Sequence, residues 1–308
     1  CPAQSFVGES TCVGCNCGYG VAPKHDSITG FTRDFPAPAY RNFNDSRWGS
    51  RIAATSNAVI VGNRSANLNI VSVFERNSFG TFEEVAQLKP SGSPTNAQFG
   101  YEVGIDANIA AVGAYNETTG NLKAGAGYIY ERQPNGSWTF AKRILPGGLP
   151  SNASFGQSVA VSGNNVLFGG PNMNAKGTNS GGVVLVERNG GKWDKLVNIT
   201  PTELKAGDRL GWRGTVAMQG NRLAVGAREH TGVASKSGGV WIFEKGTAWT
   251  QKSYIKVTKC ANSQGQFAGR VKLDGDDLAV MSDGCGGYGG GSYNLGGVHM
   301  YRRQSNGT

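Results

Sequence analysis

The sequence contains an internal repeat of about 55 residues, and this repeat restricts the possible folds more than any other feature. Five segments align with one another, and each opens on an aromatic residue or Leu. They begin at Trp48, Phe99, Phe155, Leu210 and Phe267, so successive starts are 51 to 57 residues apart. A fixed period of this length is typical of chains built from one repeated supersecondary unit, as in solenoids and propellers.

Each repeat predicts four short strands. Two apolar strands come first, joined by a two-residue turn such as Gly163-Asn164 or Gly220-Asn221, residues that tolerate the positive φ of a tight hairpin. A polar loop leads to a third strand, and a short Asn/Gly turn leads to a fourth that begins with an aromatic residue. The third strands are predicted at Val71–Glu75, Gly127–Glu131, Val183–Glu187, Val240–Glu244 and Val298–Tyr301, and the fourth strands begin at Phe82, Trp138, Trp193 and Trp249.

Four antiparallel strands per repeat, repeated five times, predict an all-β fold, a five-bladed β-propeller of four-stranded antiparallel blades. No stretch between strands has the pattern of a crossover helix, which excludes parallel-sheet folds. The 48 glycines among 308 residues, about twice the usual share, also argue against a helical protein.

We expect the last blade to lack a fourth strand from its own repeat, because the fifth repeat reaches only Thr308 in this sequence. The segment Gly30–Pro36 resembles the fourth-strand segment Ser137–Pro146, so we expect residues 27–36 to pair with the strand around Val298–Tyr301 and close the ring. The alternative is a closing strand from a neighbouring molecule, which would build a head-to-tail polymer. The predicted domains are a Cys-rich N-terminal arm at 1–26 and a propeller at 27–308, with 27–47 as closing strand and linker.

Six cysteines indicate an oxidising compartment. Four lie in the arm and two lie far along the chain, without the paired spacing of a zinc site, so disulfides are the favoured interpretation and their connectivity stays open. We expect the arm either to dock on the last blade of its own molecule or to reach a neighbouring molecule. The chain opens without a charged and apolar leader, which indicates a mature or trimmed form. The predicted disulfide residues are Cys1, Cys12, Cys15, Cys17, Cys260 and Cys285.

Seven Asn-X-Ser/Thr sequons, about twice the number expected by chance, predict N-linked glycans and an extracellular, secreted or cell-surface location. The net charge of +9 is scattered along the chain, so we expect no nucleic-acid partner. No apolar run approaches the ~18 residues of a membrane span. The predicted glycosylation sites are Asn44, Asn63, Asn116, Asn135, Asn152, Asn198 and Asn306.

The repeats resemble FG-GAP repeats, the blade repeats of integrin-α-type β-propellers. The resemblance rests on Phe99-Gly100 with Val112-Gly-Ala114, Phe155-Gly156 with Gly169-Gly-Pro171, and Asp208-Arg-Leu-Gly211 with Val225-Gly-Ala227. It implies an adhesive or ligand-binding role, and such propellers often carry D-x-D-x-D-G calcium loops. The equivalent loops here are not Asp-rich, and Asp274–Asp277 sits at a hairpin turn, so we predict neither calcium nor another cofactor.

No catalytic constellation is evident in the sequence. The three histidines are His25, His230 and His299; His230 lies beside Glu229, where it could serve as a base or ligand, but an exposed loop histidine is the favoured interpretation. Nucleophile-elbow, phosphate-loop and His-Glu-X-X-His motifs are absent from the sequence. The tryptophans that open the fourth strands are expected to pack between blades, with stacking on sugars as the alternative.

The sequence therefore predicts a non-enzymatic extracellular structural or adhesive glycoprotein, with a surface filament or matrix assembled through the N-terminal arm as one form of it. The alternatives are a lectin-like or receptor propeller that binds a ligand and, less favoured, an enzyme acting on polysaccharide. Expected partners are covalent N-glycans and either other copies of the chain or another surface protein or glycan. No catalytic, metal-binding or cofactor-binding residue is predicted.

Overall fold

The computed structural model describes residues 48–63, 69–92, 94, 97–256, 266–283 and 296–304. The Cys-rich arm, the closing strand, all six cysteines, His25, Asn44 and Asn306 fall outside these residues, so the predictions made for them stay predictions. Within the described residues, no helix is long and apolar enough to cross a membrane.

The described strands form five antiparallel sheets, and each sheet follows chain order from its innermost to its outermost strand. The sheets comprise β1 (Trp48–Ala54), β2 (Ala58–Asn63), β3 (Val71–Arg76) and β4 (Phe82–Leu88); β5 (Glu102–Asp106), β6 (Ile109–Ala114), β7 (Ala126–Arg132) and β8 (Trp138–Ile144); β9 (Ser158–Ser162), β10 (Asn165–Gly170), β11 (Gly182–Asn189) and β12 (Lys192–Ile199); β13 (Val216–Gln219), β14 (Arg222–Ala227), β15 (Gly239–Lys245) and β16 (Trp249–Ile255); and β17 (Phe267–Asp274), β18 (Asp277–Ser282) and β19 (Gly297–Arg302).

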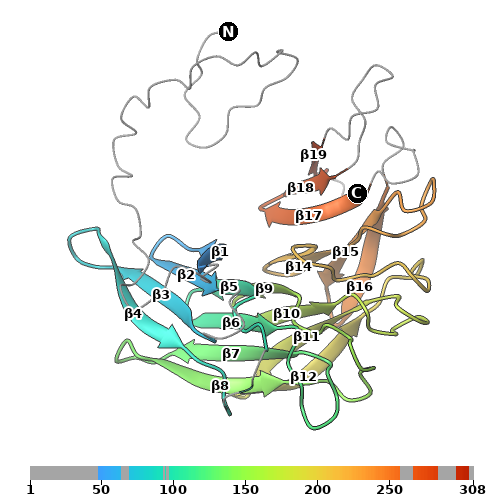
Figure 1. Cartoon of the computed structure of the whole chain (residues 1–308). Coiled ribbons are helices and arrows are strands. Elements are labelled where there is room, and N and C mark those ends of the chain that lie inside the picture. The colour runs from blue at the N-terminus through green and yellow to red at the C-terminus, as the bar shows by residue number, and fades with distance from the viewer. Residues whose placement is uncertain are drawn as a thin grey trace, which may run out of the picture. The chain divides into compact units, whose positions relative to one another are not determined.

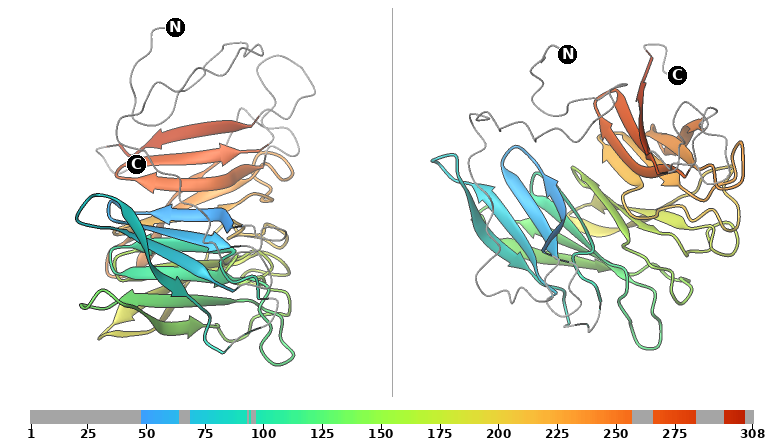
Figure 2. Two further views of the ribbon diagram at one scale, coloured as in Figure 1. Left: turned by 60° about the vertical axis from the view of Figure 1, so that its left-hand side comes forward. Right: turned by 45° about the horizontal axis from the view of Figure 1, so that its top comes forward.

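These sheets are the blades of a five-bladed β-propeller, which confirms the predicted fold. The innermost strands are neighbours in series: β5 packs between β1 and β9, and β13 packs between β9 and β17. Figures 1 and 2 show the blades following one another in chain order from β1–β4 to β17–β19. The last blade has three described strands, and the outer edge of β19 has no described strand beside it.

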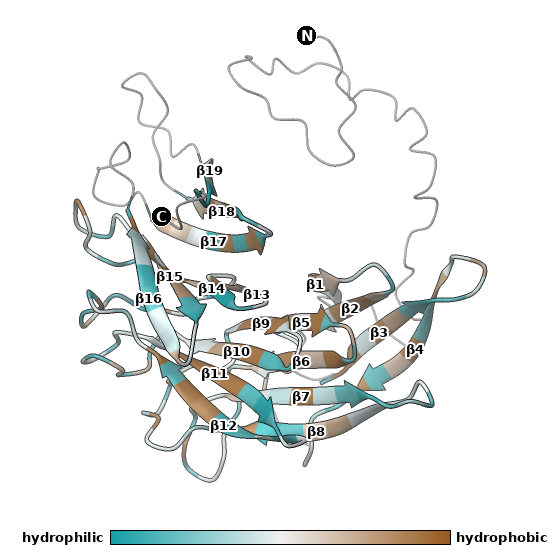
Figure 3. Cartoon of the chain, turned by 180° about the vertical axis from the view of Figure 1, so that it is seen from behind, coloured by the Kyte–Doolittle hydropathy of each residue, from teal (hydrophilic) through white to brown (hydrophobic). Residues whose placement is uncertain are grey.

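The apolar core lies between blades. Four clusters each combine side chains of two consecutive blades, such as Ile60 with Val112, or Val166 with Ile129. Every residue of β6 is buried, as its small apolar sequence predicts for a strand with sheets on both faces. The outer strand β16 alternates partly buried and exposed residues. Figure 3 shows the same contrast, with brown stretches on β6 and β10 and paler or teal colour on β16.

Two glycines show why the repeat requires this residue where blades meet. Gly156, the second residue of the third repeat, has φ +85° and lies against the end of β6. A Cβ on Gly113 of β6 would lie 1.8 Å from the Gly156 carbonyl oxygen, which no side chain can accept. The excess of glycine in the sequence is therefore in part the condition for close contact between blades.

Candidate functional site

The fourth residue of every repeat marks one end of the central axis. These residues lie in or just before the first half of the innermost strands, three positions after the opening aromatic residue or Leu. They differ in kind from blade to blade, and the set is Arg51, Glu102, Ser158, Arg213 and Arg270. Because a propeller places equivalent positions around one axis, the three cations and the carboxylate interact with one another although they come from different repeats.

Arg51 and Glu102 form the centre of this group. The Arg51 Nε donates a 3.0 Å hydrogen bond to the Glu102 Oε2, and each side chain is only 12% exposed. Arg51 also donates through Nη1 to the backbone carbonyl of Ser50 at 2.5 Å. The pair is thus held in place by both side-chain and backbone contacts.

Tyr101 joins the second blade to the fourth. The guanidinium carbons of Arg51 and Arg213 lie 5.8 Å and 5.7 Å from the centre of its ring, and the Arg213 Nη1 donates to its hydroxyl at 3.3 Å. The ring also packs against Tyr115, with centroids 4.2 Å apart. We call Arg51, Tyr101, Glu102, Arg213 and Arg270 the axial cluster.

Burial controls the electrostatics of the axial cluster. Desolvation raises the pKa of Glu102 above its ordinary value, although Arg51, Arg270 and Lys272 oppose this rise. Desolvation likewise lowers the pKa of Arg51, and repulsion from Arg213 and Arg270 adds to the effect, whereas Glu102 opposes it. Arg270 and Lys272 themselves are exposed. The result is a buried carboxylate of raised pKa beside cations that solvent can reach.

Three residues in or next to the innermost strands have buried polar atoms without partners among the described residues. The hydroxyl of Ser158 and the side-chain carbonyl of Gln157 are buried and have no hydrogen-bond partner among the described residues, and the same holds for the hydroxyl of Ser50. Ser158 is completely buried. Buried polar atoms normally have partners, so unpaired ones call for an explanation such as a bound ligand or water.

A second set of contacts is structural and repeats between blades. In each case a tryptophan that opens an outer strand donates its indole N–H to a glutamate of the preceding blade, and a cation from its own blade pairs with the same glutamate. The distances from indole to carboxylate are 2.8, 2.6 and 3.2 Å for Trp138 with Glu75, Trp193 with Glu131 and Trp249 with Glu187, and the cations are Arg132, Arg188 and Lys245. This confirms that the tryptophans pack between blades.

His230 is buried, so the interpretation as an exposed loop histidine is wrong. Its Nδ1 lies 2.7 Å from the Asp208 Oδ2 and its Nε2 lies 2.8 Å from the Tyr254 hydroxyl. The reason is that Asp208 and Tyr254 come from a neighbouring loop and from β16, which local sequence does not reveal. Glu229 instead pairs with Arg209 and Lys236 at the surface.

The Asp208–His230–Tyr254 chain resembles a catalytic triad but has the features of a packing unit. Burial, with Glu203 and Asp208 nearby, raises the pKa of Tyr254 to about 12, so its hydroxyl stays protonated. The third residue after the second strand is His230 here, Glu117 in the second blade and Met173 in the third. Glu117 accepts a 2.6 Å hydrogen bond from the Tyr128 hydroxyl, and Met173 lies against Gly170 and Gly182. In the second, third and fourth blades this position therefore packs within its own blade.

The described sequons differ in exposure. Asn135, Asn152 and Asn198 are exposed and Asn116 is partly buried. Asn63 is completely buried in β2, and its side-chain nitrogen, the atom that a glycan would modify, is not accessible to solvent. A glycan on Asn63 is therefore incompatible with the folded blade.

Among the described residues, no group of three or more His, Cys, Asp or Glu side chains is arranged to hold a metal ion.

The FG-GAP repeat family matches residues 82–130, 138–185 and 193–243. The chain is an FG-GAP repeat β-propeller. Each match begins at the aromatic residue of an outer strand and ends in the third strand of the next blade, so the sequence repeat and the structural blade are offset by one strand. No curated protein matches the chain in sequence.

Solved structures share the fold at low identity. A protein of Lactobacillus plantarum superposes with a TM-score of 0.51 at 11% identity, covering 84% of this chain and 68% of that one. The periplasmic gluconolactonase of Pseudomonas aeruginosa superposes with a TM-score of 0.50 at 12% identity, covering 84% of this chain and 70% of that one. A Bacteroides fragilis protein proposed to be a 6-phosphogluconolactonase superposes with a TM-score of 0.52 at 14% identity, covering 84% of this chain and 68% of that one. At this identity the likeness shows the fold.

These structures overturn two of our expectations. We expected a non-enzymatic protein with a structural or adhesive role, assembled into a filament or matrix. The same architecture occurs in proteins named for lactone hydrolysis, so a propeller of this kind does not argue against an enzyme. Sequence inspection also missed the axial cluster, because its charged members share a repeat position and not a residue type.

Proposed function

We propose that the chain is a hydrolase that opens the ring of a sugar lactone at the axial cluster. The observation that carries this proposal is Glu102, a largely buried carboxylate of raised pKa among Arg51, Arg213 and Arg270. A base is most effective when its pKa approaches the working pH, and burial moves Glu102 in that direction. The names of the gluconolactonase structures support the choice of substrate class.

The proposed reaction needs only water and the residues present. Glu102 takes a proton from a water molecule while the oxygen of that water bonds to the lactone carbonyl carbon. The carbonyl oxygen gains negative charge, which the cations and the buried hydroxyl of Ser158 stabilise. The bond from this carbon to the ring oxygen then breaks, and the ring oxygen leaves as a hydroxyl with the proton held by Glu102. The product is an open-chain sugar acid.

The cationic side of the cluster favours a substrate that carries its own negative charge. Arg213 and Arg270 have the fork geometry that binds carboxylate or phosphate, and Arg270 and Lys272 are exposed to an incoming ligand. Phosphorylated or carboxylated lactones should therefore bind more tightly than neutral ones, and this preference should weaken in high salt.

Hydrolysis of glucono-δ-lactone and 6-phosphogluconolactone tests the proposal directly. The full chain is expected to release acid faster than the spontaneous reaction in a pH-stat, and Glu102→Gln is expected to lose at least 100-fold in kcat/KM. Asp194→Asn, an exposed carboxylate on β12, is the matched control and should retain full activity. A wild-type rate equal to the spontaneous rate with both substrates would refute the function.

We also propose that the protein is a secreted glycoprotein. The support is the even number of cysteines and the exposure of the sequon residues Asn135, Asn152 and Asn198. Peptide-N-glycosidase treatment of protein made in a eukaryotic secretory host should lower its mass by several glycans. Peptide mapping should find Asn63 unmodified, and a glycan there would contradict the buried position of this residue.

A further inference from the structure

The fourth blade holds two arginines against one tryptophan. The guanidinium carbons of Arg209 and Arg228 lie 5.3 Å and 5.4 Å from the centre of the Trp212 ring. All three residues are partly exposed. Two like charges at one ring repel each other, and the attraction of each cation to the ring offsets part of this repulsion. We call Arg209, Trp212 and Arg228 the arginine–tryptophan group.

This group lies next to the axial cluster. Arg213, a member of that cluster, directly follows Trp212 in the chain. A Cβ built on Gly214 would lie 2.8 Å from the Arg270 Nη1, so the guanidinium of Arg270 lies along the same loop. One loop, residues 212–214, therefore contacts both sets of cations. A ligand longer than one sugar ring is able to contact both sets at once.

The propeller fold does not require arginine in this group. Its members occupy equivalent positions of the repeat: the residue before the opening aromatic residue or Leu, the third residue, and the residue after the second strand. These positions meet in another blade too, since Tyr101 packs against Tyr115. The first repeat has Arg47 and Arg64 at two of them, and both lie outside the described residues. The second, third and fifth repeats have no arginine in this set, which reads Gln98, Tyr101 and Tyr115; Ser154, Gln157 and Pro171; and Gln266, Gly269 and Asp283.

The two arginines are only loosely paired with carboxylates. The Arg209 Nη1 lies 3.7 Å from the Glu229 Oε1, and the Arg228 Nη1 lies 3.8 Å from the Asp283 Oδ2. Both distances exceed that of a hydrogen bond. Arg228 donates through Nη2 to the side-chain carbonyl of Gln266, and its Nε has no partner among the described residues. Each guanidinium therefore keeps N–H donors without a close acceptor.

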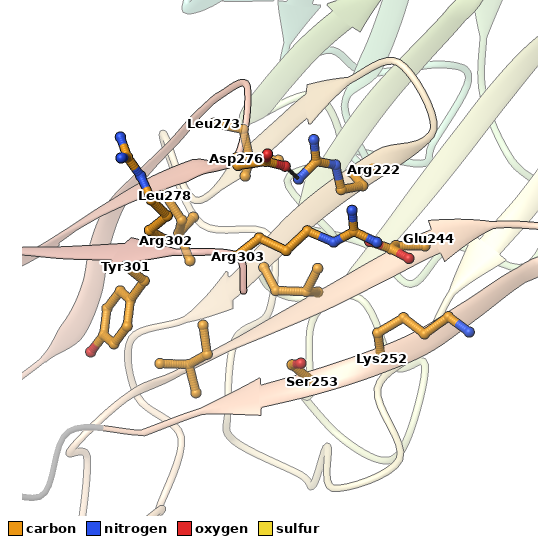
Figure 4. A pocket seen from close by; sticks show the side chains of 12 residues that line it. Arg222, Glu244, Lys252, Ser253, Leu273, Asp276, Leu278, Tyr301, Arg302 and Arg303 are labelled. Carbon is orange, nitrogen blue, oxygen red and sulfur yellow. Dashed lines mark hydrogen bonds and ion pairs between the residues drawn. The ribbon is translucent and has the colours of Figure 1, made fainter. Parts of the chain in front are cut away.

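Arginines at the pocket between the last two blades are paired more closely. Figure 4 shows this pocket, which has a volume of about 280 Å³ and is lined in part by Arg222 and Arg303. The Arg222 Nη1 lies 2.8 Å from the Asp276 Oδ1, and the Arg303 Nη2 lies 3.3 Å from the Glu244 Oε1. These carboxylates already neutralise the two cations, so the arginine–tryptophan group is the better place for an anion.

We propose that the arginine–tryptophan group binds an anionic sugar unit and that the substrate is a lactone at the end of an acidic oligosaccharide. This inference rests on the proposed function, with the lactone at Glu102 and the neighbouring sugar unit at Arg209 and Arg228. The carboxylate of a uronic acid fits the fork of N–H donors that a guanidinium presents. The net charge of +9 also attracts a ligand that carries several negative charges.

Binding of a sugar that contains no lactone tests the subsite separately from the reaction. In isothermal titration calorimetry of the full chain, trigalacturonic acid should bind at least tenfold more tightly than cellotriose, a neutral trisaccharide, and added salt should weaken the complex. Arg228→Gln should lower the affinity for trigalacturonic acid at least tenfold. The matched control is Arg76→Gln, which should bind like the wild type, because Arg76 also lies over a ring, 4.8 Å from the centre of Phe82. Equal affinity of the wild type for both trisaccharides, or an Arg228→Gln variant that binds like the wild type, would overturn the subsite.

Hydrolysis rates distinguish failure of the subsite from failure of the proposed function. The wild type should open a δ-lactone that ends a uronic-acid disaccharide with a higher kcat/KM than glucono-δ-lactone. Arg209→Gln and Arg228→Gln should each lower the ratio of these two kcat/KM values at least tenfold, mainly through KM, and Arg76→Gln should preserve it. Hydrolysis of neither lactone with trigalacturonic acid still bound would refute the function and leave the subsite standing. Hydrolysis of both lactones with the ratio unchanged in the Arg209 and Arg228 variants would refute the subsite alone.

Discussion

Trp193 of the third blade donates its indole N–H to Glu131 of the second blade across 2.6 Å, although the two residues are 62 positions apart in the chain. The same contact joins Trp138 to Glu75 and Trp249 to Glu187. An outer strand pairs with only one neighbouring strand, and this hydrogen bond also links it to the preceding blade. The contact between blades is therefore polar and directional as well as apolar.

Acid should weaken the contact that Glu187 makes with the next blade. Although burial acts in the opposite direction, hydrogen bonds from Lys195, Lys245 and Trp249 lower the pKa of Glu187 from 4.5 to about 2. Because the folded-state pKa lies below the unfolded one, the stabilisation is complete above about pH 4.5 and is lost as the pH falls towards 2, with a size of about 3 kcal/mol. Urea unfolding should show Glu187→Gln well below the wild type at pH 7 and close to it near pH 2. Glu83→Gln, an exposed carboxylate on β4, should show no such convergence.

Glu102 should exchange stability for activity. Its pKa is raised in the folded state, so ionising it costs free energy, and this cost grows as the pH rises above 4.5 through the raised pKa. Glu102→Gln is expected to have a higher Tm than the wild type at pH 7 while it loses lactone hydrolysis. On the acid side of its pH profile, wild-type kcat/KM should fall with an apparent pKa above that of an ordinary glutamate. A variant that is both less stable and fully active would show that Glu102 serves only to pair with Arg51.

The contact of Gly113 with Gly156 should tolerate no side chain. A methyl group at Gly113 would overlap the Gly156 carbonyl oxygen, so Gly113→Ala should cost roughly 3 kcal/mol or more in urea unfolding. The matched control is Gly147→Ala, since Gly147 has an ordinary φ and open space around its Cα. Equal stability of the two variants would show that the blades can separate at little cost.

His230 should matter for stability and not for rate. His230→Gln leaves Asp208 and Tyr254 without their ordered partner, which should cost about 2 kcal/mol. Lactone hydrolysis measured on the folded fraction should be unchanged. A loss of more than 100-fold in kcat would instead move the active site from the axial cluster to this buried chain.

Short-range sequence patterns were sufficient to predict the strands but not to predict the candidate site. Phe82, Trp138 and Trp249 begin outer strands as predicted, and Trp193 is the second residue of β12, because alternation and turn residues act over a few positions. The axial cluster depends on symmetry, since Arg51 and Glu102 meet only when two repeats are placed around one axis. Comparing the fourth residue of every repeat, rather than seeking a motif, would have shown this set of charges. The burial of His230 likewise depends on residues 22 and 24 positions away.

The offset between the sequence repeat and the blade has a consequence for how the domain can come apart. Each repeat from Phe82 onward supplies the outer strand of one blade and the inner strands of the next. A blade is therefore built from two consecutive repeats and cannot melt without exposing a strand that belongs to its neighbour. Gene duplication of one repeat adds a blade without creating a free edge between blades. Because the repeated sequence unit is not the structural blade, we expect neighbouring blades to unfold together.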